Sequence, residues 1–142
     1  MVTAVIAAIV IALCIALVIA VARDPGPPAS EVALAYELAW DRLDFDALWS
    51  LAGPELRDGR SRHDFIADKR AAYAERGELR GLARDVSLEE VIAGKDVAVA
   101  RTRVELRDGS IAHNEMHLVR GDGRWRVVSY ELRTSPDTAP PG

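Results

Sequence analysis

The sequence predicts an α+β fold: an N-terminal transmembrane helix, then three helices that pack on a curved antiparallel four-stranded sheet. Three observations predict it. Residues 2–22 carry no charged side chain, residues 31–77 place apolar side chains at helical spacing, and residues 82–133 change to an alternating pattern of period two. A run of helices followed by a run of strands is typical of the α+β class.

The composition divides the chain into four parts. All 18 basic and 22 acidic side chains follow the apolar segment, so the 142 residues form an anchor (1–22), a Pro-rich linker (23–30), one domain (31–133) and a tail (134–142) that we expect to be disordered. The single Cys14 excludes a disulfide scaffold. A net charge of −4 without an unbroken basic patch argues against a nucleic-acid partner.

Residues 2–22 are long enough to span a bilayer, because a 21-residue helix covers roughly 31 Å. The expected partner of this segment is therefore the lipid bilayer, and the expected location is the cell membrane with a single pass. A secreted protein, cleaved after Ala22, is the alternative, because Ala20-Val21-Ala22 fits a signal-peptidase site. The run exceeds a signal core and no Lys or Arg precedes it, which favours an uncleaved anchor. Arg23 and Arg42 slightly favour a cytoplasmic domain.

Helix-capping residues mark the three helices of the domain. Ser30 is a candidate N-cap for the first helix, Asp44 or Asp46 for a short second helix, and Ser61 for a third that ends near Gly77. Arg57, Arg60, Arg62, Lys69 and Arg70 lie around the third helix. They could touch anionic headgroups, but interleaved aspartates favour a solvated helix face.

Four strands are predicted at 82–93, 96–106, 110–120 and 124–133, with glycine-containing connectors between them. A three-residue loop in the middle hairpin gives one apolar and one charge-matched face, whereas a two-residue loop would set apolar residues against charges. The predicted pairs are Val104–Ala112, Ala100–Met116, Ala98–Leu118, Arg101–Glu115 and Arg103–His113. The last hairpin stays ambiguous, because Trp125–Val127 and Val128–Tyr130 offer apolar residues to both faces.

Three segments resemble the NTF2-like (cystatin-like, SnoaL-like) superfamily. Ala33-Leu-Ala-Tyr-Glu-Leu-Ala-Trp40 with Leu43-Asp-Phe-Asp-Ala-Leu-Trp49 resembles the family's opening helix, break and D-F-x-A-L start. Gly53-Pro-Glu-Leu56 with Ser61-Arg-His-Asp-Phe65 is similar to the loop and entry of the third helix, and Gly121-Asp-Gly-Arg-Trp-Arg-Val-Val128 to the closing strand pair. The resemblance covers about 31–133 and carries a fold rather than an activity.

This resemblance implies a cone with an apolar pocket at its wide end, for which the expected lining residues are Tyr36, Trp40, Phe65, Tyr73, Met116 and Tyr130. Relatives similar to ketosteroid isomerase or polyketide cyclases place a base and an oxyanion donor in the cone. The candidates for such roles are Tyr36, Asp44, Asn114 and Tyr130. Asp44 is more simply a helix cap and the tyrosines core aromatics, so no catalytic residue is assigned.

The favoured function is thus a membrane-anchored, non-catalytic binding or assembly module without a cofactor, which meets a protein partner or a small apolar ligand. The alternative is a small lyase or isomerase that uses the cone pocket. An anchor before such a domain is similar to two groups of envelope proteins. One comprises actinobacterial proteins associated with mammalian-cell-entry transport, which implies an actinobacterial source. The other comprises bitopic type IV secretion subunits, from which this chain departs by lacking a cytoplasmic N-terminal tail.

His113, Glu115 and His117 share one strand face, and imidazole with carboxylate suits zinc. Arg101 and Arg103 would lie beside them and oppose a cation, so no metal site is assigned. The same outer face carries apolar residues that could form a homodimer, namely Val97, Val99, Ile111 and Val119.

Overall fold

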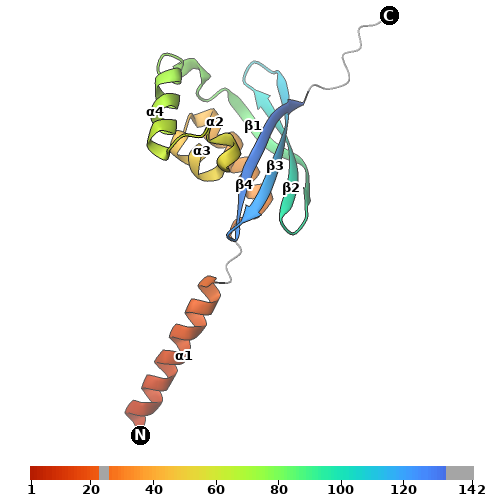
Figure 1. The fold of residues 1–142 in the computed structure, drawn as a ribbon. Coiled ribbons are helices and arrows are strands. Elements are labelled where there is room, and N and C mark those ends of the chain that lie inside the picture. The colour runs from red at the N-terminus through yellow and green to blue at the C-terminus, as the bar shows by residue number, and fades with distance from the viewer. Residues whose placement is uncertain (23–25, 134–142) are drawn as a thin grey trace, which may run out of the picture.

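The computed structural model describes residues 1–22 and 26–133; residues 23–25 of the predicted linker and the predicted tail, 134–142, lie outside the described residues. Figure 1 shows an N-terminal helix, a layer of helices and a curved sheet. The helices and strands are α1 (Val2–Ala22), α2 (Ala29–Arg42), α3 (Phe45–Leu51), η1 (Pro54–Leu56), α4 (Arg62–Tyr73), η2 (Gly77–Leu79), β1 (Ala83–Ala93), β2 (Val97–Leu106), β3 (Ile111–Gly121) and β4 (Arg124–Arg133).

The helix starts follow local capping chemistry. The Asp44 side chain accepts a hydrogen bond from the Ala47 N–H and caps α3, and Ser61 caps α4 in the same way. The prediction of Ser30 as the cap of α2 is wrong, because Pro28 occupies that position and Ser30 lies inside the helix. Pro28 makes no side-chain cap, and its carbonyl oxygen accepts from the Glu31 and Val32 N–H groups at 3.1 and 3.2 Å. The third helix ends at Tyr73, earlier than predicted.

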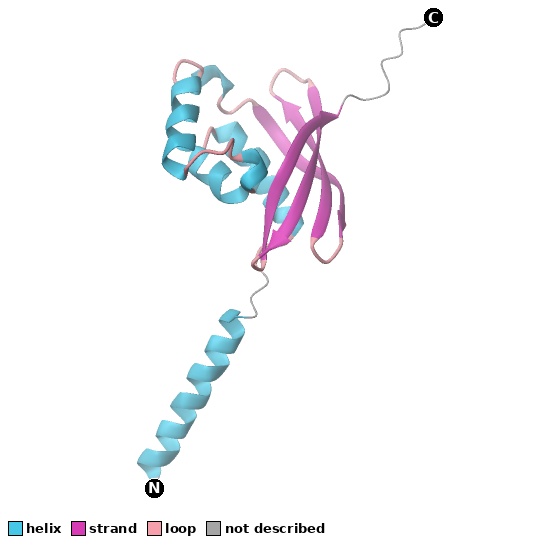
Figure 2. Cartoon of the chain, in the orientation of Figure 1, coloured by secondary structure: helices cyan, strands magenta, loops and turns pink. Residues whose placement is uncertain are grey.

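The four strands form one antiparallel meander in the order β1-β2-β3-β4 (Figure 2). The β2–β3 register pairs Val104 with Ala112 and Arg101 with Glu115, which confirms the three-residue loop. Gly109 has φ +88°, a left-handed conformation that a side chain would strain. Apolar residues therefore face the helices, and the charged pairs face away from them.

A bulge in the β3–β4 pairing explains why the last hairpin is ambiguous in sequence. The register shifts between His117 and Leu118, so Leu118 pairs with Val127 whereas Met116 pairs with Tyr130. One extra residue on β4 reverses the alternation of its side chains. Trp125 and Val127 are buried below the bulge, and Tyr130 faces the helices above it.

The core lies between α2 and the inner face of the sheet. Val32, Ala33 and Tyr36 of α2 pack in one cluster with inward side chains of the central strands, such as Ala100 and Met116. The helices α2, α3 and α4 cover one side of the curved sheet and leave the other side uncovered (Figures 1 and 2). The sheet curvature opens a space at one end of this sandwich, where the candidate site lies.

Candidate functional site

A buried carboxylate, Glu37, lies at the centre of the candidate site. Its side chain projects from α2 toward the sheet and is only 5% exposed. Three side chains donate hydrogen bonds to it: Thr102 Oγ1 to Oε1 at 2.6 Å, Asn114 Nδ2 to Oε1 at 2.9 Å, and the Tyr130 hydroxyl to Oε2 at 2.8 Å. A carboxylate accepts such bonds at both oxygens, so the strands solvate Glu37 in place of water.

The hydroxyl and amide hydrogens around Glu37 are all used in hydrogen bonds to Glu37 or to one another. The second Asn114 Nδ2 hydrogen goes to the Tyr130 oxygen at 2.9 Å, while the only Tyr130 hydroxyl hydrogen goes to Glu37. Thr102, which is 0% exposed, has one hydroxyl hydrogen and uses it on Glu37. No hydroxyl or amide hydrogen of the three is left for a ligand.

The environment of the two tyrosines holds them in the neutral form. Burial, the nearby Glu37 charge and the hydrogen bond to Glu37 raise the pKa of Tyr130 far above its ordinary value. Burial also raises the pKa of Tyr36. The Glu37 charge raises it further, whereas the nearby Trp40 N–H lowers it, both by smaller amounts. The Tyr36 and Tyr130 rings meet edge to face with centroids 5.3 Å apart. Neither hydroxyl is therefore a source of protons near neutral pH.

A cleft of about 290 Å³ opens beside this network. Glu37, Asn114 and Tyr130 form its polar end, together with Asp41, whose carboxylate accepts a hydrogen bond from the Ala83 N–H. Most of the wall is apolar and comes from Trp40, Leu79, Leu82, Val86, Val104, Leu106 and Ala112. The cleft thus combines an apolar wall with a polar end at which Asn114 and Tyr130 use their donor hydrogens within the Glu37 network and Asp41 accepts one backbone hydrogen bond.

A second cavity, of about 190 Å³, lies on the α3–α4 side and shares Trp40 and Tyr130 with the cleft. Tyr36, Phe65 and the ion-paired Asp58 and Lys69 also line it. The Trp40 Nε1–H is buried and meets no acceptor among the described residues, although it lies near the Tyr36 hydroxyl. Because this nitrogen is buried, it offers no open donor to a ligand in either cavity.

The structure distributes the predicted pocket and catalytic residues unevenly. Tyr130 and Trp40 line both cavities, Asn114 lines the cleft, and Tyr36 and Phe65 line the second cavity. The remaining three lie elsewhere: Met116 is fully buried in the core, Tyr73 packs on Trp40 and Phe45, and Asp44 caps α3. Tyr36 and Asp44 therefore do not converge on a shared space.

Glu37 is not among the residues predicted from sequence, because a charged residue beside an apolar stripe is ordinarily solvated. A signal was present on the strands. Thr102 and Asn114 are directly paired across β2 and β3. They lie on the same inward face as their neighbours two residues away, Ala100, Val104, Ala112 and Met116. Two polar residues at inward positions of a sheet require a buried polar partner, which α2 supplies.

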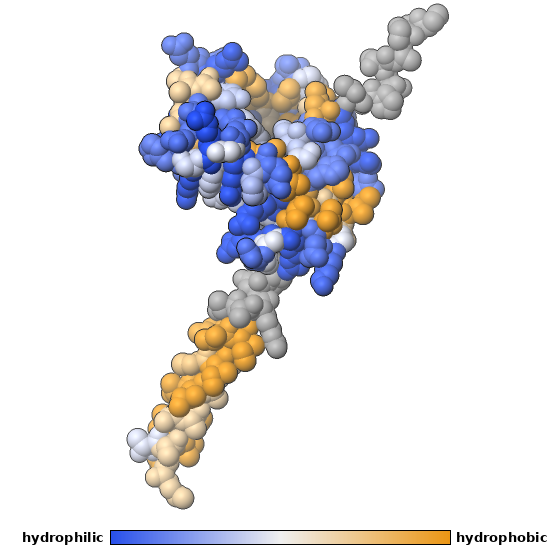
Figure 3. Space-filling model, viewed as in Figure 1, coloured by the Kyte–Doolittle hydropathy of each residue, from blue (hydrophilic) through white to orange (hydrophobic). Residues whose placement is uncertain are grey.

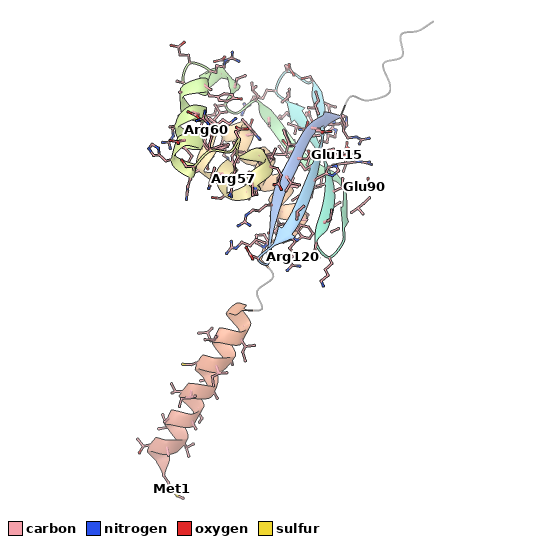
Figure 4. The ribbon with its side chains drawn as sticks, viewed as in Figure 1. Met1, Arg57, Arg60, Glu90, Glu115 and Arg120 are labelled. Carbon is pink, nitrogen blue, oxygen red and sulfur yellow. The ribbon has the colours of Figure 1, made fainter. Side chains whose placement is uncertain are left out.

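The polar residues His113, Glu115 and His117 lie on the uncovered face of the sheet, where Figure 4 shows Glu115 and Glu90 away from the helices. His117 contacts Glu115 at 3.1 Å, but His113 Nδ1 contacts Glu89 at 2.7 Å instead. Arg101 and Arg133 also approach Glu115, and hydrogen bonds from His117 and Arg101 lower the pKa of its carboxyl group. Within residues 1–22 and 26–133, no group of three His, Cys, Asp or Glu has metal-binding geometry.

Comparisons with known proteins identify the fold. No protein-family model matches the chain, and no curated protein matches it. Solved structures do. An NTF2-like transpeptidase, so named, from Campylobacter jejuni has a TM-score of 0.51 and 18% identity over 71% of this chain and 97% of its own. An NTF2-like protein of unknown function from Silicibacter pomeroyi has a TM-score of 0.48 and 23% identity over 74% of this chain and 94% of its own. At 18% identity, the similarity to the Campylobacter jejuni structure shows a shared fold and no shared function. Residues 29–133 have an NTF2-like α+β fold.

Proposed function

We propose that this chain is a membrane-anchored NTF2-like binding module that holds a small, largely apolar ligand without transforming it. The observation that carries the proposal is the closed Glu37 network. Because Thr102, Asn114 and Tyr130 spend their hydrogens on Glu37 and on each other, the polar end of the cleft stabilises the fold and has no spare donor.

The cleft also indicates what the ligand would be. Its wall is mostly aliphatic and contains the exposed Leu82, so an apolar body would gain free energy by leaving water. A volume of about 290 Å³ suits a compact molecule rather than a long lipid chain.

An anchor role for α1 rests on its length and composition. Among the described residues, one helix is long and apolar enough to cross a membrane; it lies near the N-terminus, where a signal sequence would pass the same test. Nearly all of its described surface is apolar, apart from a small polar spot near the N-terminal end (Figure 3). We propose that it stays attached and holds the domain at the bilayer. The actinobacterial source and an envelope transport role stay predictions from the sequence resemblance.

Ligand binding is testable with the full chain in nanodiscs. Indole fluorescence would be followed during titration with a panel of small apolar carbonyl compounds. Ala112→Phe fills the cleft and should weaken binding at least tenfold, whereas Val99→Phe, on the uncovered face of the sheet, should not. Equal affinity in the wild-type protein and Ala112→Phe would contradict the proposal.

A small isomerase or lyase is the second candidate, and the presence of a carboxylate in the cone favours it. As a base, Glu37 would need a lone pair directed at the substrate, so a donor would have to leave it. Proton abstraction from a bound carbonyl compound exchanges C–H for C–D in heavy water, which mass spectrometry of the ligand detects. Exchange that Glu37→Gln abolishes would establish catalysis and overturn the non-catalytic proposal.

Topology needs a separate experiment. In a Cys14→Ala background, a cysteine at the exposed turn residue Ser110 would be labelled on intact cells with a membrane-impermeant maleimide. Labelling before lysis places the domain outside, and protection until lysis places it in the cytoplasm. The mass of the labelled chain tests the anchor itself, because a chain that begins at Arg23 has lost α1.

A further inference from the structure

The end of the sheet nearest the linker carries a surface of mixed apolar and cationic character, which we call the sheet-base patch. It comprises the β1–β2 and β3–β4 turns and the strand ends beside them. Its residues are Ile92, Lys95, Val97, Val119, Arg120, Arg124 and Arg126. Figure 4 places the labelled Arg120 at this end of the sheet, far from Glu90 and Glu115.

The apolar part of the patch is exposed on the uncovered side of the sheet. Val97 pairs directly with Val119, and Ile92 pairs with Val99 on the neighbouring strand, which sets these side chains on one face. Ile92 is 62% exposed, Val97 57% and Val119 41%. Apolar side chains also gather on the lower part of the sheet in Figure 3. Such exposure on a small domain marks a surface that meets another apolar phase.

Several cations of the helical layer form ion pairs with nearby aspartates. On the helical layer, Arg62 and Arg70 both contact Asp46, and Lys69 contacts Asp58. Arg60 likewise contacts Asp68.

Across the part of the chain that the structure describes, Lys95, Arg124 and Arg126 take part in no ion pair. These three cations outnumber the two carboxylates at these turns, Asp96 and Asp122. The patch therefore carries uncompensated positive charge.

The patch is tied to the end of α1 by a short stretch of chain. A Cβ atom added to Gly26 would lie 3.4 Å from the Gly123 carbonyl oxygen, so the chain enters the domain against the β3–β4 turn. Four Cα–Cα steps separate Ala22 from Gly26, and they reach at most about 15 Å. The Arg120 N–H donates to the Asp96 carbonyl at 2.8 Å, which joins the two turns into one unit. Whatever the tilt of α1, these turns stay near its final residue.

We propose that the sheet-base patch docks on the anionic phospholipid surface of the bilayer that holds α1. Lysine and arginine side chains would contact the headgroup phosphates, and the three apolar side chains would enter the interfacial region. The inference rests on the proposed anchor. It fixes the orientation of the domain, because the sheet base faces the lipid and the helical layer with its cleft extends along and away from it.

The test uses the full chain with Cys14→Ala, held in nanodiscs at one copy per disc. An environment-sensitive dye is attached at Ile92→Cys, and lipids with a spin label in the headgroup region quench it on contact. Nanodiscs of phosphatidylcholine alone are compared with nanodiscs that also contain phosphatidylglycerol. A dye at Ser110→Cys, on the turn at the other end of the sheet, is the positional control.

The dye at residue 92 should be quenched in anionic nanodiscs, much less in zwitterionic ones, and less at high salt. Lys95→Gln with Arg124→Gln should lower the ratio of docked to undocked domain about 30-fold, since each cation near the surface contributes about 1 kcal/mol, or about fivefold. Arg76→Gln with Arg80→Gln is the matched control. These two exposed cations follow α4 and should leave quenching unchanged.

Equal quenching in both lipid mixtures, or none in either, overturns the lipid docking while the chain remains in its nanodisc. Protection of the dye that appears only with two copies per disc, in either lipid mixture, means that the face pairs with a second chain instead. A chain that fails to co-purify with nanodiscs, or that begins at Arg23 when isolated from cells, refutes the anchor. Loss of the anchor also refutes the docking inference, and co-purification and mass distinguish this outcome from a failure of docking alone.

Discussion

Replacing Glu37 should destabilise the domain in a graded way that depends on how many of its three donors lose their acceptor. In Glu37→Ala, Thr102 is fully buried and cannot recruit water, while Asn114 and Tyr130 lie at the cleft and partly can. An unsatisfied buried donor costs about 1–3 kcal/mol, so the free energy of unfolding should fall by about 3–5 kcal/mol. For a domain of ordinary stability, about 5–15 kcal/mol, this is a large fraction.

Glu37→Gln separates the effect of hydrogen bonding from that of shape. Its side-chain oxygen still accepts from Thr102 and Asn114, but its amide group is a donor facing the Tyr130 hydroxyl. The hydroxyl hydrogen must then turn to the cleft, and the cost should be only about 1 kcal/mol. The predicted order of stability is therefore wild type, then Glu37→Gln, then Glu37→Ala.

Urea unfolding of the full chain in detergent micelles, followed by indole fluorescence, measures these differences. Glu31→Gln, at an exposed position on the same helix, should change the free energy of unfolding by about 0.5 kcal/mol or less. The reasoning is refuted if Glu37→Ala lies within about 1 kcal/mol of the wild type, or if Glu37→Gln costs as much as Glu37→Ala.

Three further measurements test the same structure. The pKa values of Tyr36 and Tyr130 are raised above their ordinary value of 10. The stability that the neutral tyrosines contribute is fully present below pH 10 and is lost as the pH rises through the folded-state values. The change in absorbance at 295 nm near pH 10 should therefore be smaller than the change expected for the three tyrosines of the chain until the protein unfolds. The pKa of Glu115 is lowered, so the ionised carboxylate contributes to stability above the ordinary pKa of a glutamate, and this contribution is lost as the pH falls through the lowered pKa. Glu115→Gln should therefore reduce the loss of stability at acid pH. An unchanged loss would contradict this reasoning. Asp44→Ala should cost about 1 kcal/mol of stability through loss of the α3 cap and leave ligand affinity unchanged, whereas lost binding at full stability would assign Asp44 to the site.

Most of the sheet could be predicted because its pattern is dictated by local rules. The predicted strands begin and end within one residue of β1–β4, and the register of the middle hairpin follows from keeping apolar residues on one face. The last hairpin could not be predicted, because a bulge after His117 changes the alternation of β4. Nothing in the local pattern of Trp125–Tyr130 shows where the extra residue is placed. In the structure this segment of β4 contacts Gly53, which is distant in sequence and whose N–H donates to the Val127 carbonyl at 2.7 Å.

The candidate site was predictable in part, for a related reason. Asn114 falls on an inward position in the predicted register of the middle hairpin, and Tyr130 was a candidate through the family resemblance; the structure places both at the cleft. Glu37 was missed because its burial depends on Thr102, Asn114 and Tyr130, which are 65, 77 and 93 residues away in sequence. Helical periodicity measures only the neighbours of a residue along its own helix. A buried charge is visible in a sequence only through the partners that satisfy it.

The same arrangement links the fold, the cleft and the membrane surface. Glu37 pins α2 to β2, β3 and β4 at the open end of the cone, so the cleft beside it has a wall held by hydrogen bonds rather than by packing alone. A ligand there would meet a preformed site and would pay little for ordering it. At the other end of the strands, the turns that carry Lys95 and Arg124 lie within reach of α1. If those turns rest on the bilayer, the cleft lies at the end of the domain away from the lipid, open to a ligand that arrives from the aqueous side. This geometry is what the proposed binding module beside a membrane would require, and the fold alone does not decide between an enzyme and a binding protein.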